Sequence, residues 1–111
     1  MELRVKVWVE EDGKLVLSTW RVALLEAIAR TGSLQAAAAE LGFPYRRAWG
    51  KIREIEANLG VKLIETTRGG VGGGASTLTP VAEEYVRRYR SFYTEALKLL
   101  RERFEAAFRE V

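Results

Sequence analysis

The strongest constraint on the fold is a pair of helical segments separated by a turn of about three residues. The first segment starts at Ser33, a natural N-cap, and runs through alanines of high helix propensity until Gly42. The second starts at Pro44, whose missing N–H costs nothing in a first turn, and runs to about Leu59, before Gly60. Two helices joined so tightly must pack against each other, and the alanines allow a close approach.

The second helix has two opposite faces. At about 100° per residue, one face is apolar and the other carries arginines. The apolar face consists of Ala48, Ile52, Ile55 and Leu59, and the opposite face of Arg46, Gly50, Arg53 and Ala57. Because the apolar face packs inward, the arginine face is expected to point to solvent.

A short helix pair with a basic second helix predicts a helix-turn-helix, in which that helix enters the DNA major groove. Arg46 lies in the first turn, where its planar fork can bond guanine bidentately. Gly50 would let the DNA backbone approach closely, while Arg47 and Lys51 suit phosphates. The predicted DNA-contacting residues are Ser33, Gln35, Pro44, Tyr45, Arg46, Arg47, Gly50, Arg53, Arg68, Gly69 and Gly70. A merely solvated basic face, plain capping by Ser33 and core packing of Trp49 stay open as alternatives.

Short strands are expected on both sides of the helix pair. Alternation of apolar and charged residues from Leu3 to Val9, with an Asp12-Gly13 turn before "LVL", predicts an N-terminal hairpin. Ser18 or Thr19 then caps a core helix that ends near Arg30. After the helix pair, "VKLIETT" and "ASTLT" predict two strands around the loop "RGGVGGG". This loop can be a wing that lies near the DNA backbone or a plain flexible hairpin, because no helix follows it directly as a dinucleotide-binding motif requires.

Thr79 and Pro80 are a strong N-cap and first-turn signal, and no helix breaker follows up to Val111. A helix of about 30 residues is roughly 45 Å long, which exceeds the core of a small domain. We therefore expect a winged domain over residues 1–79 and a dimerisation helix over residues 80–111. The predicted dimer-interface residues are Tyr85, Tyr89, Phe92, Ala96, Leu99, Leu100, Phe104 and Phe108. A helix folded back on its own domain is the alternative.

Composition limits the chemistry. The 111 residues include no cysteine and no histidine, which removes disulfides, thiol nucleophiles, Cys/His zinc sites and histidine acid–base catalysis. No stretch approaches the roughly 20 apolar residues of a membrane span, and no signal peptide is visible. We therefore expect a cytoplasmic protein without catalytic activity, cofactor or metal. The 18 basic and 15 acidic residues give only +3, so the position of the charge matters more than its sum.

From about Leu24 to Tyr89 the sequence resembles the N-terminal DNA-binding domain of the ModE family of molybdenum-responsive transcriptional regulators. The likeness lies in "FPYRRAWGKIREIE" of the second helix and in "LIETTRGGVGGGASTLT" of the wing, and "LGVKLIETT" is distantly similar to LysR-type regulators. The resemblance implies a homodimeric winged helix-turn-helix that controls transcription, with DNA contacts from Tyr45, Arg46, Arg47 and the wing around 68–70. Regulators of this family that sense molybdate carry C-terminal oxyanion-binding domains. Because this sequence ends at Val111, we assign it no molybdate site.

Three functions follow from these patterns. The first is a mainly α, winged helix-turn-helix transcription factor that binds double-stranded DNA as a homodimer. The second is a protein-interaction module that recruits a partner through the long helix and keeps the winged fold as a scaffold. The third, a small nucleotide-binding enzyme built on the glycine loop, lacks the phosphate-loop lysine that such a site needs.

Overall fold

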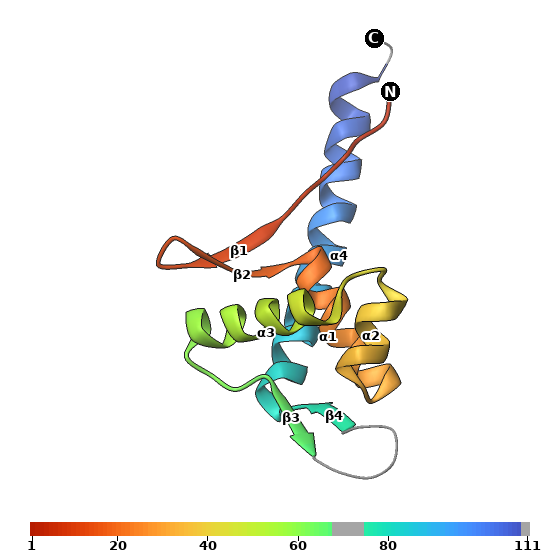
Figure 1. Ribbon diagram of the computed structural model, residues 1–111. Helices are drawn as coiled ribbons and strands as arrows, with labels where there is room; N and C mark the ends of the chain where they lie inside the picture. Colours follow the sequence, from red (N-terminus) through yellow and green to blue (C-terminus); the bar gives the residue numbers. More distant parts are fainter. Residues whose placement is uncertain (68–74, 110–111) are drawn as a thin grey trace.

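A computed structural model describes residues 1–67 and 75–109, and this part of the chain forms a winged helix-turn-helix with a long C-terminal helix (Figure 1). In chain order, the elements are β1 (Trp8–Glu11), β2 (Lys14–Ser18), α1 (Thr19–Thr31), α2 (Leu34–Glu40), α3 (Tyr45–Leu59), β3 (Ile64–Thr67), β4 (Ala75–Leu78) and α4 (Pro80–Phe108). Each strand pair is an antiparallel two-stranded sheet, and β4 pairs with β3 from Ile64 opposite Leu78 to Thr67 opposite Ala75. The mainly α class with small β elements is confirmed.

The capping signals act as predicted at three helix starts. The hydroxyls of Ser18, Ser33 and Thr79 accept backbone N–H groups at 3.1–3.2 Å and so cap α1, α2 and α4. Gly60 ends α3 at a φ of +71°, in the left-handed region that favours glycine. Pro44 differs by one position, because it is the N-cap of α3 with extended backbone and the helix starts at Tyr45.

The N-terminal strand is shorter than the alternation predicted. It begins at Trp8, and the preceding residues run as an extended segment beside α4 (Figure 1). Leu3, Val5 and Val7 are half-buried, while their charged neighbours are exposed. The alternation correctly predicted that one side of residues 3–7 is apolar. This segment lies against α4 (Figure 1), although a paired strand of the hairpin was expected.

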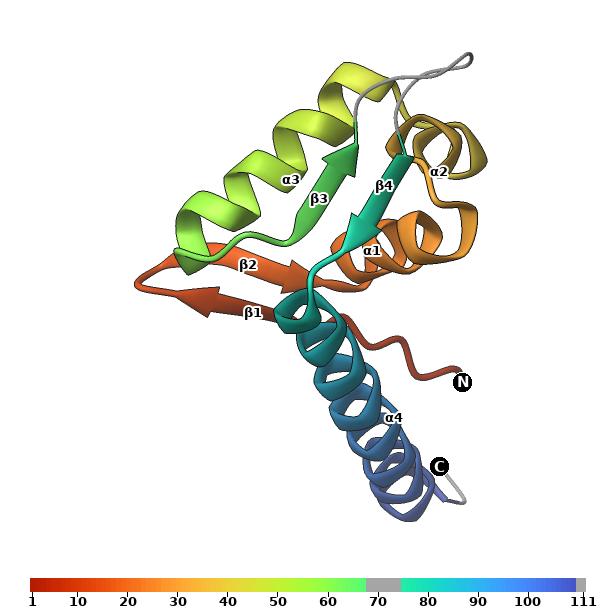
Figure 2. The same cartoon turned by 90° about the horizontal axis from the view of Figure 1, so that it is seen from below.

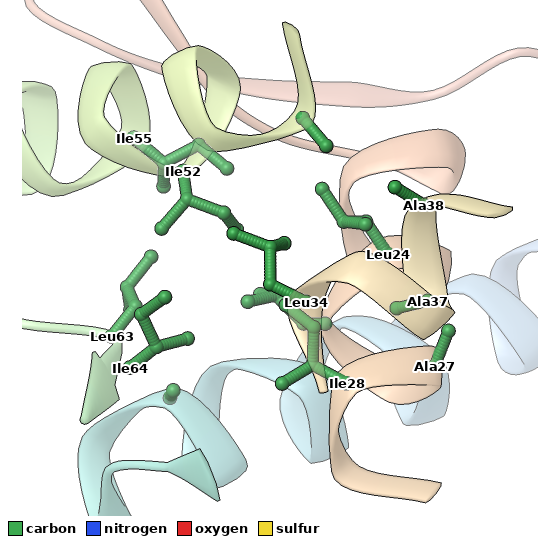
Figure 3. Close-up of a cluster of buried hydrophobic side chains, with 13 residues drawn as sticks. Leu24, Ala27, Ile28, Leu34, Ala37, Ala38, Ile52, Ile55, Leu63 and Ile64 are labelled. Carbon is green, nitrogen blue, oxygen red and sulfur yellow. The ribbon is translucent and has the colours of Figure 1, made fainter. Parts of the chain in front are cut away.

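One hydrophobic core connects the three small helices, the wing and the start of α4. Figure 3 shows side chains from α1, α2, α3 and β3 pointing toward one another. The core consists of Leu24, Leu25, Ala27, Ile28, Leu34, Ala37, Ala38, Ala48, Ile52, Ile55, Leu63, Ile64 and Ala82. Because α3 gives this core three residues spaced three or four apart, its rotation about its own axis is fixed.

A second, smaller cluster anchors α4 to the domain. Tyr89 packs there with Val16, Leu17 and Val22 and is only 3% exposed. Its hydroxyl donates to the carbonyl of Val7 and lies 3.0 Å from the Thr19 hydroxyl. A single chain already buries this side chain, so a place for Tyr89 in a dimer interface stays a prediction.

We expect Tyr89→Phe to lower the free energy of unfolding by about 1–2 kcal/mol, because the Val7 carbonyl and the Thr19 hydroxyl lose their shared partner. Urea unfolding followed by circular dichroism measures this change. Tyr93→Phe is the matched control, since Tyr93 stacks on Tyr89 at 5.9 Å and its hydroxyl makes no hydrogen bond within the described part of the chain. Equal stability of both variants would show that the buried hydroxyl contributes nothing.

Candidate nucleic-acid interface

The arginine face of α3 points to solvent, as the sequence predicted. Ala48, Ile52 and Ile55 are fully buried, whereas Arg46 and Gly50 on the opposite side are exposed. A Cβ built on Gly50 would meet no atom within 4 Å, so nothing in the protein's own packing requires glycine there. An interior helix glycine costs about 1 kcal/mol relative to alanine. Close approach of a DNA backbone to Gly50 stays a prediction, and a tolerated surface glycine is the alternative.

The cations of α3 differ in how they are engaged. Arg53 stacks on Trp49 at 4.4 Å from the ring centroid, and Arg47 lies 5.0 Å from the Phe43 ring. Lys51 is 3.6 Å from Glu54, which also binds the buried Arg21 at 3.2 Å. Within residues 1–67 and 75–109, Arg46 has no carboxylate inside 4.0 Å. Its guanidinium is therefore the one most ready to bind an external acceptor.

The two aromatic residues at the start of α3, Tyr45 and Trp49, differ in exposure. Tyr45 is 50% exposed in the first turn and can reach a ligand. Trp49, one turn later, packs partly against the main core and carries Arg53 on its ring. Core packing was the favoured interpretation for Trp49, and the structure agrees with it.

The other residues predicted to contact DNA differ in their surroundings. The Ser33 hydroxyl accepts the Ala36 N–H at 3.1 Å, so capping already explains this residue. Gln35 is exposed in the first turn of α2. Arg68, Gly69 and Gly70 lie outside the described residues, and their contacts with DNA stay a prediction.

The elements predicted to contact DNA gather on one side of the molecule. Figure 2 shows the first turn of α3, the last residue of β3 and the first residue of β4 on the same side, while α4 points away from it. The Ser76 N–H donates to the Gly32 carbonyl at 2.8 Å and so ties β4 to the turn between α1 and α2. The first turn of α3 and one end of the β3–β4 pair thus lie on the same side (Figure 2), an arrangement that suits a groove and its adjacent backbone.

Three arginines in the first half of α4 are paired inside the chain. Arg90 binds Glu26 bidentately at 2.6 and 3.0 Å, and this hydrogen bonding raises the pKa of Arg90. Arg87 and Arg88 both bond Glu84 and lower the pKa of its carboxyl. Arg90 thus links α4 to α1, and Arg87 and Arg88 form ion pairs along α4 itself.

Sequence reasoning missed Glu56 of α3 as a residue of this site. Its Oε2 atom accepts the backbone N–H groups of Leu63 and Ile64, where the wing begins. The one available signal is its position, since an acid at this place lies within about 60° of the apolar stripe of α3. A carboxylate so close to a core needs hydrogen-bond donors, but the sequence does not say which.

A basic helix exposed beside a small wing defines a winged helix-turn-helix of the kind that bacterial regulators use. The model of the family described as "Bacterial regulatory helix-turn-helix protein, lysR family" matches residues 20–83, and the chain belongs to this family. Within residues 1–67 and 75–109 there is no helix with the length and hydrophobicity needed to cross a membrane.

The chain is also similar in sequence to three longer bacterial proteins. It is 40% identical over 80 residues to the molybdenum-pterin-binding protein MopB of Rhodobacter capsulatus, covering 72% of this chain and 30% of MopB. It is 41% identical over 78 residues to the molybdenum transport protein ModE of Herbaspirillum seropedicae, covering 70% of this chain and 29% of that protein. The DNA-binding transcriptional dual regulator ModE of Escherichia coli K12 is 30% identical over 89 residues, covering 80% and 34%. The chain thus spans about a third of the length of these relatives.

Two solved structures share the fold. The CbnR DNA-binding domain in its DNA complex has a TM-score of 0.61 at 23% identity, and the match covers 79% of this chain and 95% of that one. ArgP from Mycobacterium tuberculosis has a TM-score of 0.51 at 23% identity, covering 73% and 30%. At this identity the likeness supports the fold alone.

Proposed function

We propose that this protein is a ModE-like transcriptional regulator that binds specific duplex DNA through α3 and the wing, without catalysis. The observation that carries this proposal is the exposed Arg46, which lies in the first turn of α3 on the side opposite the fully buried Ala48, Ile52 and Ile55. The names of the relatives, which include transcriptional regulators, agree with it. Such a regulator acts on bacterial DNA, so we assign it to the cytoplasm.

Duplex binding at increasing salt concentrations tests the proposal. Each phosphate contact made by a lysine or arginine lowers the slope of log affinity against log salt by roughly 0.9. We expect a steep slope together with a preferred sequence after selection from random duplexes. A protein that uses the winged fold only as a scaffold for a protein partner would show neither. Absence of any salt-dependent binding would therefore favour the interaction module.

We further propose that two copies associate through the part of α4 that projects beyond the domain (Figure 1). Phe92 and Leu99 are each 51% exposed there, and Leu100 and Phe108 are exposed as well. The other predicted interface residues are Ala96 and Phe104, which are half-buried, and Tyr85, which packs on the domain core. A division into a winged domain over residues 1–79 and a dimerisation helix over residues 80–111 is part of this proposal. A two-fold dimer would match two half-sites about one DNA turn apart.

A further inference from the structure

The side chain of Glu56 joins α3 to the beginning of the wing. The side chain is 13% exposed, and its Oε2 atom accepts the Leu63 N–H at 2.8 Å and the Ile64 N–H at 3.4 Å. Hydrogen bonds from backbone donors to a carboxylate are stronger than those between neutral groups. The first residue of β3 and the residue before it are therefore held at a fixed distance from α3.

The same carboxylate also faces a cation of the proposed DNA-binding surface. Its Oε1 atom lies 3.8 Å from a guanidinium nitrogen of Arg53, whose other contact is the ring of Trp49. One oxygen of Glu56 thus accepts hydrogen bonds from the start of the wing, while the other lies near Arg53 on the arginine face of α3. No other acidic side chain in the described ranges contacts both elements.

Apolar packing alone does not fix this arrangement. Leu63 and Ile64 are buried in the core, but contacts between aliphatic side chains are non-directional and tolerate small shifts of one element along another. On the far side, the Thr79 N–H bonds the Leu63 carbonyl at 2.9 Å and the Thr79 hydroxyl bonds the Lys62 carbonyl at 2.7 Å. Thr79 therefore sets the wing against α4, and Glu56 sets it against α3.

The geometry points to Glu56 as a positioning residue that holds the wing in register with α3, so that both contact one DNA duplex together. This inference rests on the proposed DNA-binding function. Without Glu56 the core, the Ser76–Gly32 bond and Thr79 keep the wing attached and Arg46 still reaches bases, but the start of β3 loses its polar link to α3 and can shift along it. Loss of Glu56 should therefore change the base preference in the flanks, where the wing would lie, and leave the base preference near α3 unchanged.

Amide hydrogen exchange without DNA tests the structural half of the inference. We expect Glu56→Ala to raise the exchange of the Leu63 and Ile64 amides at least tenfold relative to the amides of α1. Glu56→Gln, which keeps one acceptor oxygen, should restore most of the protection. Glu65→Ala is the matched control, because the exposed side chain of this acid on β3 makes no hydrogen bond within residues 1–67 and 75–109. Unchanged exchange at both amides in Glu56→Ala would overturn the inference.

Selection of bound duplexes tests the functional half. We expect Glu56→Ala to keep the preference that depends on Arg46, to lose preference at flanking positions and to bind the selected sequence about tenfold more weakly. Unaltered flanking preference and affinity, despite faster exchange, would refute a role in DNA reading. If the wild-type protein selects no sequence, the proposed function itself fails, and the exchange data still decide whether Glu56 holds the wing.

Discussion

Replacing Phe92 and Leu99 by glutamate is expected to convert the proposed dimer to monomers and to lower affinity for a duplex with two half-sites about 100-fold or more. Both side chains lie on the same side of α4, two helical turns apart, and each is 51% exposed. At a two-fold interface every added carboxylate meets its own copy or a close neighbour, so repulsion and desolvation oppose association. Loss of the second binding module removes the gain from linked binding, which is about 100-fold or more.

The measurement is the molar mass in solution by light scattering, together with DNA titration and circular dichroism. The winged domain should remain folded, because neither side chain belongs to the buried clusters of the chain. Ser91→Glu with Thr94→Glu is the control, since it adds the same two negative charges at exposed residues on other sides of α4. A double variant at Phe92 and Leu99 that stays dimeric would place the interface elsewhere.

Local patterns in the sequence predicted the elements well, because their causes are local. The Ser18, Ser33 and Thr79 caps act on N–H groups three residues away, and the spacing of Ile52 and Ile55 determines which side of α3 is buried. The outward direction of Arg46 follows from the same spacing. These features needed no knowledge of what lies across from them.

The element that packs on an apolar stripe comes from a distant part of the chain, and the sequence pattern did not predict which element this is. Tyr89 and Phe92 continue one three-four pattern on α4, yet Tyr89 is buried against β2 and α1 while Phe92 lies beyond them. The alternation of Leu3 and Val5 likewise does not state whether a strand or a helix covers it. Glu56 was missed for a related reason, because its partners are backbone N–H groups and leave no mark in the sequence.

Replacement of Arg46 by alanine is expected to relax base preference at one position in each half-site and to cost about 1–3 kcal/mol of discrimination there. The reason is the first-turn position of this exposed arginine, whose five donors in a rigid fork can bond one guanine bidentately. Sequence selection from random duplexes, carried out with wild type and variant in parallel, measures the change. The free energy of unfolding should stay within about 0.5 kcal/mol of wild type, because Arg46 is a surface residue.

Two further variants separate base reading from attraction to phosphate. Arg46→Lys keeps the charge but loses the planar fork, so it should lose the same base preference as alanine while retaining more of the affinity. Lys51→Ala should weaken binding nearly equally for all sequences and reduce the salt slope by about 1 if Lys51 contacts a phosphate. If Arg46→Ala instead gives this uniform weakening with an unchanged sequence preference, Arg46 contacts the backbone. The base-reading role would then have to pass to another exposed residue of the first turn of α3, such as Tyr45 or Arg47.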